Sequence, residues 1–360
     1  MQYSAFSNLR LANQHVTLKK QTSVQGLVEY LGAVQAQDYP MAKWALGVRL
    51  ENITDKDIES ALNRAEILRI HVLRPTWHMV SAKDIHWMLK LSAPHIRSNT
   101  AARHRQLDLN DSKLSKFYQI LETSLRDNNH LTRHEIYSIF HQNKISTKDN
   151  RGAHILMCAE LEGLICSGVY KGKNTTFALL AERAPSSVQL SRDESLARLA
   201  QTYFNSRGPA TLRDFIWWSG LPVRDARKAL AMIENNLQEV NDEDDIYYLP
   251  DSSDFSTVMK DSVLLLPAFD EFLIAYTNRK VSINDKINKK AISNNGVFRP
   301  VIVVNGQVVG IWKRTSQKNK VFVEVTLLKT LKNSQLKKIE KEVTRLGKFL
   351  GKEIVLIFNP

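Results

Sequence analysis

The spacing of apolar residues over the first 90 positions predicts three helices followed by two strands. Apolar positions three and four residues apart predict helices over 22–34, 39–50 and 53–66. Thr54 stands at the start of the third helix as an N-cap, and Ser81 is the expected N-cap of the next one. The stretch 67–80 is rich in β-branched residues around Arg74 and Pro75, which predicts two strands joined by a turn. Three helices and then a hairpin is the element order of a winged helix.

The same order of elements recurs twice more along the chain. In the second round a helix begins after Thr132, a longer helix runs over 150–168, and a hairpin turns at Gly172. In the third round one helix begins after Thr211 and another near Pro222, and an acidic turn separates two strands. No residue-level repeat accompanies this pattern, so element order alone defines the units. We predict winged-helix units at 1–108, 109–185 and 186–258.

The chain changes character after about residue 260, where strand-like runs dominate. The pair Asn305-Gly306 is a strong signal for a two-residue hairpin turn. One amphipathic helix is expected over 333–351, followed by a final strand over 353–358. We predict a small, mostly β domain over 259–360 and an α+β fold for the whole chain.

The positive charge of the chain is concentrated in this last domain. The 360 residues carry a net charge of +13, and the stretch from Arg279 to the end holds 18 Lys+Arg against 5 Asp+Glu, so residues 1–278 are net neutral. Such a field attracts polyanions, and nucleic acid is the expected partner of a chain charged in this way. A solvated basic face that keeps the protein in solution is the simpler alternative.

Several classes of protein are disfavoured by the sequence. The longest apolar run, over 262–269, is too short to cross a bilayer, and the N-terminus lacks the apolar core of a signal peptide. Cys158 and Cys166 are the only cysteines, which favours a reduced, cytoplasmic protein without disulfides. The stretch 134–141 lacks the two histidines four apart of a zinc-protease helix. We expect no metal and no cofactor.

Two glutamines two residues apart are the main candidate for chemistry. Tyr39 precedes Pro40 and is therefore biased away from helix, so residues 35–39 are expected to be extended or turning. In an extended segment Gln35 and Gln37 point the same way. Two amides can orient one water but cannot act as strong bases. They suffice where the leaving group is already good, as in cleavage of the glycosidic bond of a cationic alkylpurine. Capping of nearby backbone groups is the structural alternative.

Five segments of the chain resemble the AlkZ-like winged-helix DNA glycosylases. They are spread over almost the full length: 11–16, 31–50, 74–89, 264–279 and 296–314. The resemblance implies three tandem winged-helix units, a C-terminal β-barrel, and a C-shaped body with a basic channel for double-stranded DNA. It also implies a DNA repair enzyme that hydrolyses the glycosidic bond of N7- or N3-alkylated purines and leaves an abasic site. Bulky adducts and interstrand cross-links are associated with the Gln-x-Gln branch.

The resemblance also assigns roles to individual residues. Gln35 and Gln37 match the family's Gln-aliphatic-Gln signature, and Thr76 with His78 matches its Thr-hydrophobic-His element. Pro75 departs from the family, in which glycine usually holds this position, so the local turn and its contact to DNA are in question. Asp38 is the nearest carboxylate. Asp270 and Glu271 are rival catalytic carboxylates, or anchors of the barrel.

The expected contacts to DNA come from two regions. Lys43 and Arg74 flank the two catalytic elements and are candidates for phosphate contacts. Further contacts are expected from the C-terminal domain, with Phe298 as a wedge in the minor groove: Phe298, Arg299, Lys313, Arg314. Trp217 and Trp218 are expected in the core.

The hypothesis is a monofunctional DNA glycosylase that acts as a monomer in the cytoplasm, at the nucleoid. The main alternative is a non-catalytic winged-helix protein, either a regulator or an architectural DNA binder. A third hypothesis is a metal-dependent nucleotide-processing enzyme that uses Asp270 and Glu271.

Overall fold

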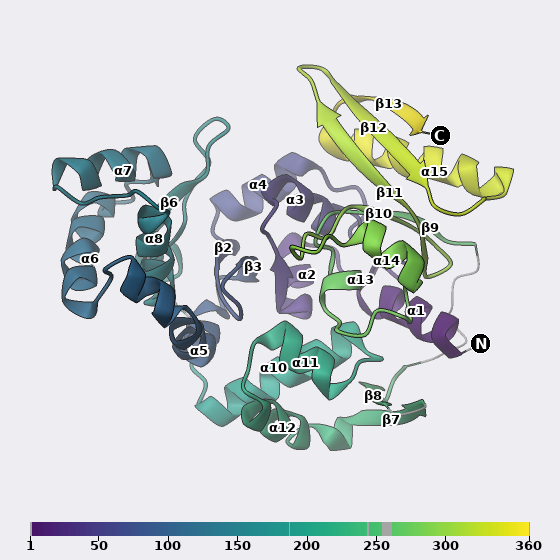
Figure 1. The fold of residues 1–360 in the computed structure, drawn as a ribbon, viewed down its shortest axis with the longest axis horizontal. Helices are drawn as coiled ribbons and strands as arrows, with labels where there is room; N and C mark the ends of the chain where they lie inside the picture. Colours follow the sequence, from purple (N-terminus) through teal and green to yellow (C-terminus); the bar gives the residue numbers. More distant parts are fainter. Residues whose placement is uncertain (1, 187, 243–244, 254–260, 360) are drawn as a thin grey trace.

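The structure is a computed structural model that describes residues 2–186, 188–242, 245–253 and 261–359. Helices and strands alternate in a mixed α+β order (Figure 1). Three groups of helices with small antiparallel sheets come first, and a larger sheet follows. Among the described residues, none of the helices combines the length and the apolar character needed to span a bilayer.

The first unit has three helices and a three-stranded sheet of order β1-β3-β2. Its elements are α2 (Val24–Leu31), β1 (Ala33–Gln35), α3 (Tyr39–Gly47), α4 (Asp55–Asn63), β2 (Ile67–His71) and β3 (Trp77–Ser81). A short α1 (Gln2–Asn13) precedes this unit, and the long α5 (Ile85–Gln106) follows it. The strand β1 lies at the edge of the sheet, so one side of its backbone needs partners from elsewhere.

The second unit repeats this arrangement, with a sheet of order β4-β6-β5. Its elements are α6 (Asp111–Leu125), β4 (Leu131–Thr132), α7 (Arg133–Gln142), α8 (Arg151–Leu161), β5 (Ile165–Ser167) and β6 (Thr176–Leu179). The unit forms a separate lobe at the left of Figure 1. Its apolar residues make a core of their own, drawn from residues 107–179.

The third unit has helices in the same order and a two-stranded hairpin. Its elements are α10 (Arg192–Arg207), α11 (Leu212–Ser219), α12 (Val223–Ala231), β7 (Leu237–Asp242) and β8 (Asp245–Pro250), after a short α9 (Leu180–Arg183). A single bridge between Ala210 and Tyr248 stands where the first two units have their first strand. The helix–helix–helix–hairpin order thus occurs three times.

The C-terminal residues form a five-stranded sheet of order β13-β12-β11-β10-β9. Its elements are β9 (Val263–Leu266), α13 (Glu271–Ile274), α14 (Asp285–Ala291), β10 (Val301–Val304), β11 (Gln307–Ser316), β12 (Lys320–Leu327), α15 (Asn333–Leu350) and β13 (Glu353–Asn359). In the described residues β9 and β13 pair with one neighbour each, so the expected closed barrel is not confirmed by strand pairing. The expected unit boundary at 258/259 lies outside the described residues.

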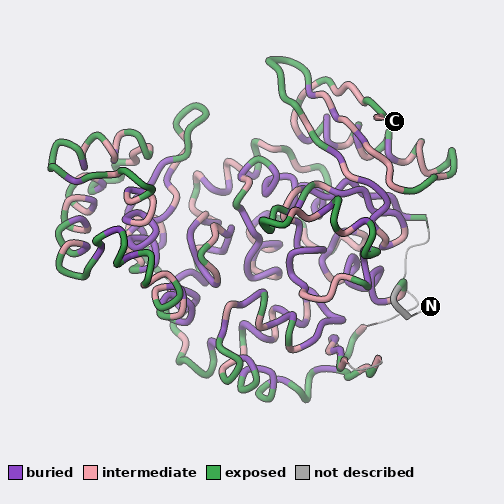
Figure 2. Tube along the Cα trace, viewed as in Figure 1, coloured by how far each residue is buried: buried purple, intermediate pink, exposed green. Residues whose placement is uncertain are grey.

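The buried residues of the first unit are continuous with those of its neighbours (Figure 2). One cluster joins α2 and α3 to the C-terminal sheet and α15, where the Trp44 and Phe349 rings lie 5.1 Å apart. A second cluster joins β2 and β3 to the third unit through Tyr203 and Trp218. Both of these rings are 0% exposed. The first unit is therefore held between the third unit and the C-terminal sheet.

Local signals in the sequence were largely correct. Thr54, Thr132 and Thr211 each form a capping box at the start of a helix. Asn305 and Gly306 have φ of 49° and 76° in the turn between β10 and β11, as a primed hairpin turn requires.

Other boundaries were wrong. Ser81 ends β3, and Asp84 precedes α5 instead. The helix expected to reach Gly168 ends at Leu161, because the β-branched end of that stretch forms β5.

Candidate active site

The two glutamines lie where β1 ends and before α3 begins. Gln35 is the last residue of β1 and is in register with His78 on β3. The backbone of Ala36 continues this pairing, since its N–H donates to the carbonyl oxygen of Trp77 at 2.7 Å. Gln37 follows in a bend, and Asp38 is the N-cap of α3, accepting from the Met41 N–H at 3.1 Å. Asp38 thus satisfies a helix end, which is a structural role.

The amides of Gln35 and Gln37 have different surroundings. Gln35 is 5% exposed, and its Oε1 accepts a hydrogen bond from Arg74 Nη2 at 2.8 Å. Gln37 is exposed, and its amide forms no hydrogen bond with the described residues. No direct hydrogen bond between the two amides occurs among those residues either. One amide is therefore fixed from inside the protein, and the other faces solvent.

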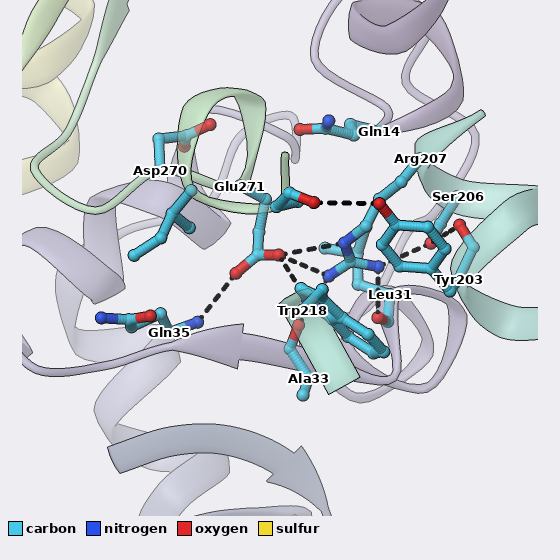
Figure 3. Close-up of polar contacts among 12 residues, drawn as sticks. Gln14, Leu31, Ala33, Gln35, Tyr203, Ser206, Arg207, Trp218, Asp270 and Glu271 are labelled. Atoms are coloured by element: carbon cyan, nitrogen blue, oxygen red, sulfur yellow. Dashed lines mark hydrogen bonds and ion pairs between the residues drawn. The ribbon is translucent and has the colours of Figure 1, made fainter. Parts of the chain in front are cut away.

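A buried carboxylate holds the strand that carries Gln35. Glu271 Oε1 accepts from the Gln35 backbone N–H at 3.0 Å, which satisfies the open edge of β1. Its Oε2 accepts from Arg207 Nη2 at 2.7 Å and from Trp218 Nε1 at 3.0 Å (Figure 3). Glu271 and the Arg207 side chain are both fully buried. A carboxylate bound by this many donors serves as an anchor and leaves no free oxygen for the sugar.

Asp270 has a similar anchoring role. It forms a bidentate pair with Arg49, at 2.8 and 2.9 Å, which ties the end of α3 to the segment after β9. Its Oδ1 also accepts from the Phe272 N–H at 2.9 Å. The rival reading of Asp270 and Glu271 as catalytic carboxylates is therefore corrected in favour of the anchoring role. Their partners could not be predicted from local patterns, because Arg49 and Arg207 lie more than 60 residues away.

His78 is a core residue of this site. It is 0% exposed, and burial together with the nearby Arg74 lowers its pKa well below the usual value for histidine. Its Nδ1 lies 3.0 Å from the carbonyl oxygen of Thr76 and must carry the proton, since a carbonyl only accepts. The Thr76 hydroxyl is buried without a hydrogen-bond partner in the described residues. A neutral, buried imidazole does not bind phosphate, so His78 acts as a core residue beside the glutamines.

Arg69 is a residue of the site that sequence reasoning missed. Its Nε donates to the carbonyl oxygen of Ala36 at 3.0 Å, between the two glutamines. The guanidinium lies 4.3 Å from the Trp77 ring and 5.7 Å from the Tyr39 ring, within cation–π distance. Burial lowers the pKa of Arg69 to about 10. An arginine at an otherwise apolar position of a predicted strand was the available signal.

Two of the residues expected to contact DNA are buried and contact other residues of the protein instead. Lys43 is 6% exposed, and its Nζ pairs with Asp55 and Glu59 at 2.6 Å each, so it is not free to bind phosphate. Phe298 is 5% exposed, and the Arg279 guanidinium lies 4.9 Å from its ring. A buried ring of this kind cannot act as a wedge in the minor groove, which corrects the expectation for Phe298.

Of the remaining cations, Arg299 and Lys313 lie on the surface and Arg314 is half-buried. Arg299 is exposed and forms no ion pair within the described residues. Lys313 is exposed and pairs with Glu324 at 3.0 Å. Burial lowers the pKa of Arg314, and Asp38 raises it in part, so β11 reaches toward the start of α3.

The two adjacent tryptophans differ. Trp218 lies in the core as expected, but Trp217 is 43% exposed, so that expectation was wrong for Trp217.

Known proteins resemble this chain over nearly its whole length. The sequence profile described as "DNA glycosylase AlkZ-like" matches residues 28–349. The chain belongs to the AlkZ-like DNA glycosylase family. This family consists of hydrolases that act on DNA. No group of three His, Cys, Asp or Glu side chains arranged to hold a metal occurs in the described part of this AlkZ-like chain.

Two comparisons support this assignment. A protein of Streptomyces sahachiroi named "Interstrand DNA cross-link repair glycosylase" is 22% identical over 363 residues, covering 95% of each chain. The solved structure of Streptomyces sahachiroi DNA glycosylase AlkZ has a TM-score of 0.82, at 20% identity and 99% coverage of both chains. This AlkZ-like chain therefore shares the mixed α+β fold of that structure.

Proposed function

We propose that this chain is a monofunctional DNA glycosylase that hydrolyses the glycosidic bond of cationic N7- or N3-alkylated purines. The observation that carries this proposal is the state of the carboxylates around the glutamine segment. Asp38 caps α3, and Glu271 binds four donors from three residues. The segment therefore offers two amides, while the fully buried Glu271 is occupied by its donors and Asp38 has one carboxylate oxygen bound in the helix cap. Such a site suits a reaction in which the base leaves without protonation.

The proposed reaction leaves an abasic site. Gln35 and Gln37 orient a water molecule toward C1′ of the lesion, and the developing positive charge on the sugar is stabilised by an amide oxygen. The alkylated base takes the electrons of the glycosidic bond and departs neutral. No metal or cofactor takes part in this scheme.

We propose that double-stranded DNA lies against the first unit and β11, in a basic channel of a C-shaped body. In this proposal the three repeated groups are winged-helix units at 1–108, 109–185 and 186–258, and the C-terminal sheet belongs to a barrel over 259–360. The half-buried Arg314 of β11, whose pKa responds to the charge of Asp38 at the start of α3, supports this placement. We further propose a monomer that works in the cytoplasm on the nucleoid.

The substrate range is proposed from chemistry and from the relative named above. The exposed Gln37 does not require a closed pocket, which suits bulky N7 adducts as well as small ones. The name of the Streptomyces sahachiroi relative adds interstrand cross-links to the lesions worth assaying.

The test is release of free base from duplex DNA that contains N7-methylguanine or a bulky N7 adduct. Wild type is expected to produce abasic sites above the spontaneous rate, and Gln37→Ala to lose about 100-fold or more. Because Gln37 is exposed and unbonded, this variant keeps its stability, so the loss reports chemistry. Thr132→Ala in the second unit is a control, since it removes only a helix cap.

A non-catalytic DNA-binding protein is the second candidate, because Gln35 is almost buried and already bonded to Arg74. That function predicts tight duplex binding, no base release, and equal affinity for wild type and Gln37→Ala. Absence of abasic sites with both kinds of adduct would refute the glycosylase and favour this candidate.

A further inference from the structure

The orientation of the Gln35 amide follows from the chemistry of its partner. Arg74 Nη2 lies 2.8 Å from Gln35 Oε1. A guanidinium has only donors, whereas an amide has one accepting oxygen and one donating nitrogen. The oxygen of Gln35 must therefore face Arg74. Its nitrogen, with two N–H donors, is left for a ligand.

Arg74 itself is held firmly by the turn between β2 and β3. Leu73 has φ of 63°, and the Arg74 N–H donates to the Val72 carbonyl oxygen at 2.7 Å. The end of α11 packs against this turn, where a Cβ on Gly220 would stand 2.4 Å from the Leu73 oxygen. The Arg74 guanidinium lies 5.8 Å from the Trp217 ring. The third unit thus fixes the arginine that fixes Gln35.

We propose that Arg74 is a positioning residue that assigns different roles to the two glutamines. The inference rests on the proposed function. The oxygen of Gln35 is already bound to a cation, so it does not stabilise a second positive charge on the sugar, and Gln35 acts as a donor. The Gln37 amide binds no partner among the described residues and acts as the acceptor that stabilises this charge.

The hydrolytic step follows from this division. A water molecule accepts a hydrogen bond from Gln35 Nε2 and donates one to Gln37 Oε1. Its remaining lone pair forms the bond to C1′ while the bond from C1′ to the base nitrogen breaks. The electron pair of that bond neutralises the cationic base, and the surplus proton of the added water passes to bulk solvent.

The first experiment measures single-turnover base release from N7-methylguanine duplex. Arg74→Met is expected to lower the rate constant about 10-fold or more, while affinity for undamaged duplex and its salt slope stay unchanged. Arg74→Lys keeps a donor-only group and recovers part of the loss. Arg279→Met is the matched control, because Arg279 lies 5.9 Å from the same Trp217 ring and forms no hydrogen bond with Gln35.

The second experiment separates the roles of the two amides. Gln35→Glu keeps an oxygen for Arg74 but loses the donor, so it is expected to be as inactive as Gln35→Ala. Gln37→Glu keeps its acceptors and is expected to retain at least 10-fold more activity than Gln35→Glu. Equal losses in the two Glu variants would overturn the division. A salt slope lowered by about one in Arg74→Met would make Arg74 a phosphate contact instead.

A third readout does not depend on activity. In protein labelled with ¹⁵N at glutamine side chains, Arg74→Met is expected to shift the Gln35 Nε2 signal, and Arg279→Met to leave it in place. An unshifted signal would overturn the inference even if wild type is active. A wild type that releases no base would refute the proposed function, and the division of roles with it. If the Gln35 Nε2 signal still shifts in Arg74→Met, the contact between Arg74 and Gln35 exists, and only the proposed function has failed.

Discussion

The first and second units share one architecture, but only the first carries a candidate site. Their sheets have the same order, β1-β3-β2 and β4-β6-β5. In the second unit Thr132 is both the last strand residue and the N-cap of the next helix. In the first unit Ala36 and Gln37 stand between the strand and the cap Asp38. The connection from strand to helix in the first unit is therefore longer by three residues, Ala36, Gln37 and Asp38, and it carries the exposed amide.

The two units also differ in how they are held. The second unit has its own apolar core, whereas the core of the first is shared with the third unit and the C-terminal sheet. The buried Arg49–Asp270 pair ties the first unit to a distant part of the chain, and Glu271, itself in a buried pair with Arg207 of the third unit, holds the Gln35 backbone; the paired side chains are 0–1% exposed. The second unit lacks any fully buried Arg–carboxylate pair in the described residues. The position of the glutamine segment thus depends on buried contacts to distant parts of the chain, and the second unit, which has its own core, does not make such contacts.

The largest expected effect comes from breaking the anchor of β1. Glu271→Gln leaves the Arg207 guanidinium buried without its counter-charge, which costs about 3–5 kcal/mol. Urea unfolding followed by circular dichroism measures this loss. Glu122→Gln in the second unit removes the exposed pair with Arg126 and is expected to cost below about 1 kcal/mol. Similar losses in both variants would contradict the difference between the units.

The next effect is a dependence of stability on pH that originates at His78. Because burial depresses its pKa in the folded state, only the unfolded chain takes up this proton as pH falls below about 6.5. The free energy of unfolding is therefore expected to fall by about 2 kcal/mol between pH 7 and pH 5 from this group. His78→Asn keeps a donor for the Thr76 carbonyl and should flatten the curve by that amount. If the free energy of unfolding changes with pH in the same way in wild type and His78→Asn, His78 is not the source of this dependence.

A smaller difference in stability is expected between the alanine variants of two glycines with positive φ. Gly32, between α2 and β1, has φ of 72°, and a Cβ there would stand 2.7 Å from Thr202 Cγ2 of the third unit. Gly172 in the second unit has φ of 63° and open space around it. Gly172→Ala is expected to cost about 1 kcal/mol from backbone strain alone, and Gly32→Ala about 1–3 kcal/mol more from the contact. Thermal unfolding of both variants checks the order.

The smallest effect concerns salt dependence of DNA binding. Neutralising Arg314 with Gln is expected to lower the slope of log K against log salt by about one. Lys337→Gln on α15 is the comparison, because α15 packs against the far end of α3 through Phe349, away from the start of α3. Equal changes of this slope in the two variants would show that DNA does not bind on the β11 side.

Local chemistry explains what was predictable from the sequence. Three of these features depend only on residues at most three positions away: the helix caps at Thr54 and Thr211 and the turn at Asn305-Gly306. They can therefore be recognised from the local sequence. The extended conformation expected at Gln35 was argued from Pro40 in the same way, but β1 was missed, because residues 33 and 34 were assigned to the preceding helix.

The missed features involve residues far apart in sequence. Partners of Glu271 lie 53 to 236 residues away, and no pattern in the sequence specifies them. Exposure could not be predicted either. Lys43 was expected on the surface as a cation and Phe298 as an exposed wedge, but tertiary packing buries both. The different states of Gln35 and Gln37 arise for the same reason.

The contact between Gln35 and Glu271 sets a limit on when the site can form during synthesis of the chain. The acceptor follows the donor by 236 residues. At a rate of about 5–20 residues per second, the ribosome needs roughly 10–50 seconds to reach it. Until then the edge of β1 lacks its anchor, whereas the second unit can already close its core. A nascent chain therefore holds a folded second lobe before it holds a finished glutamine segment, and any truncation before Glu271 leaves that segment unanchored.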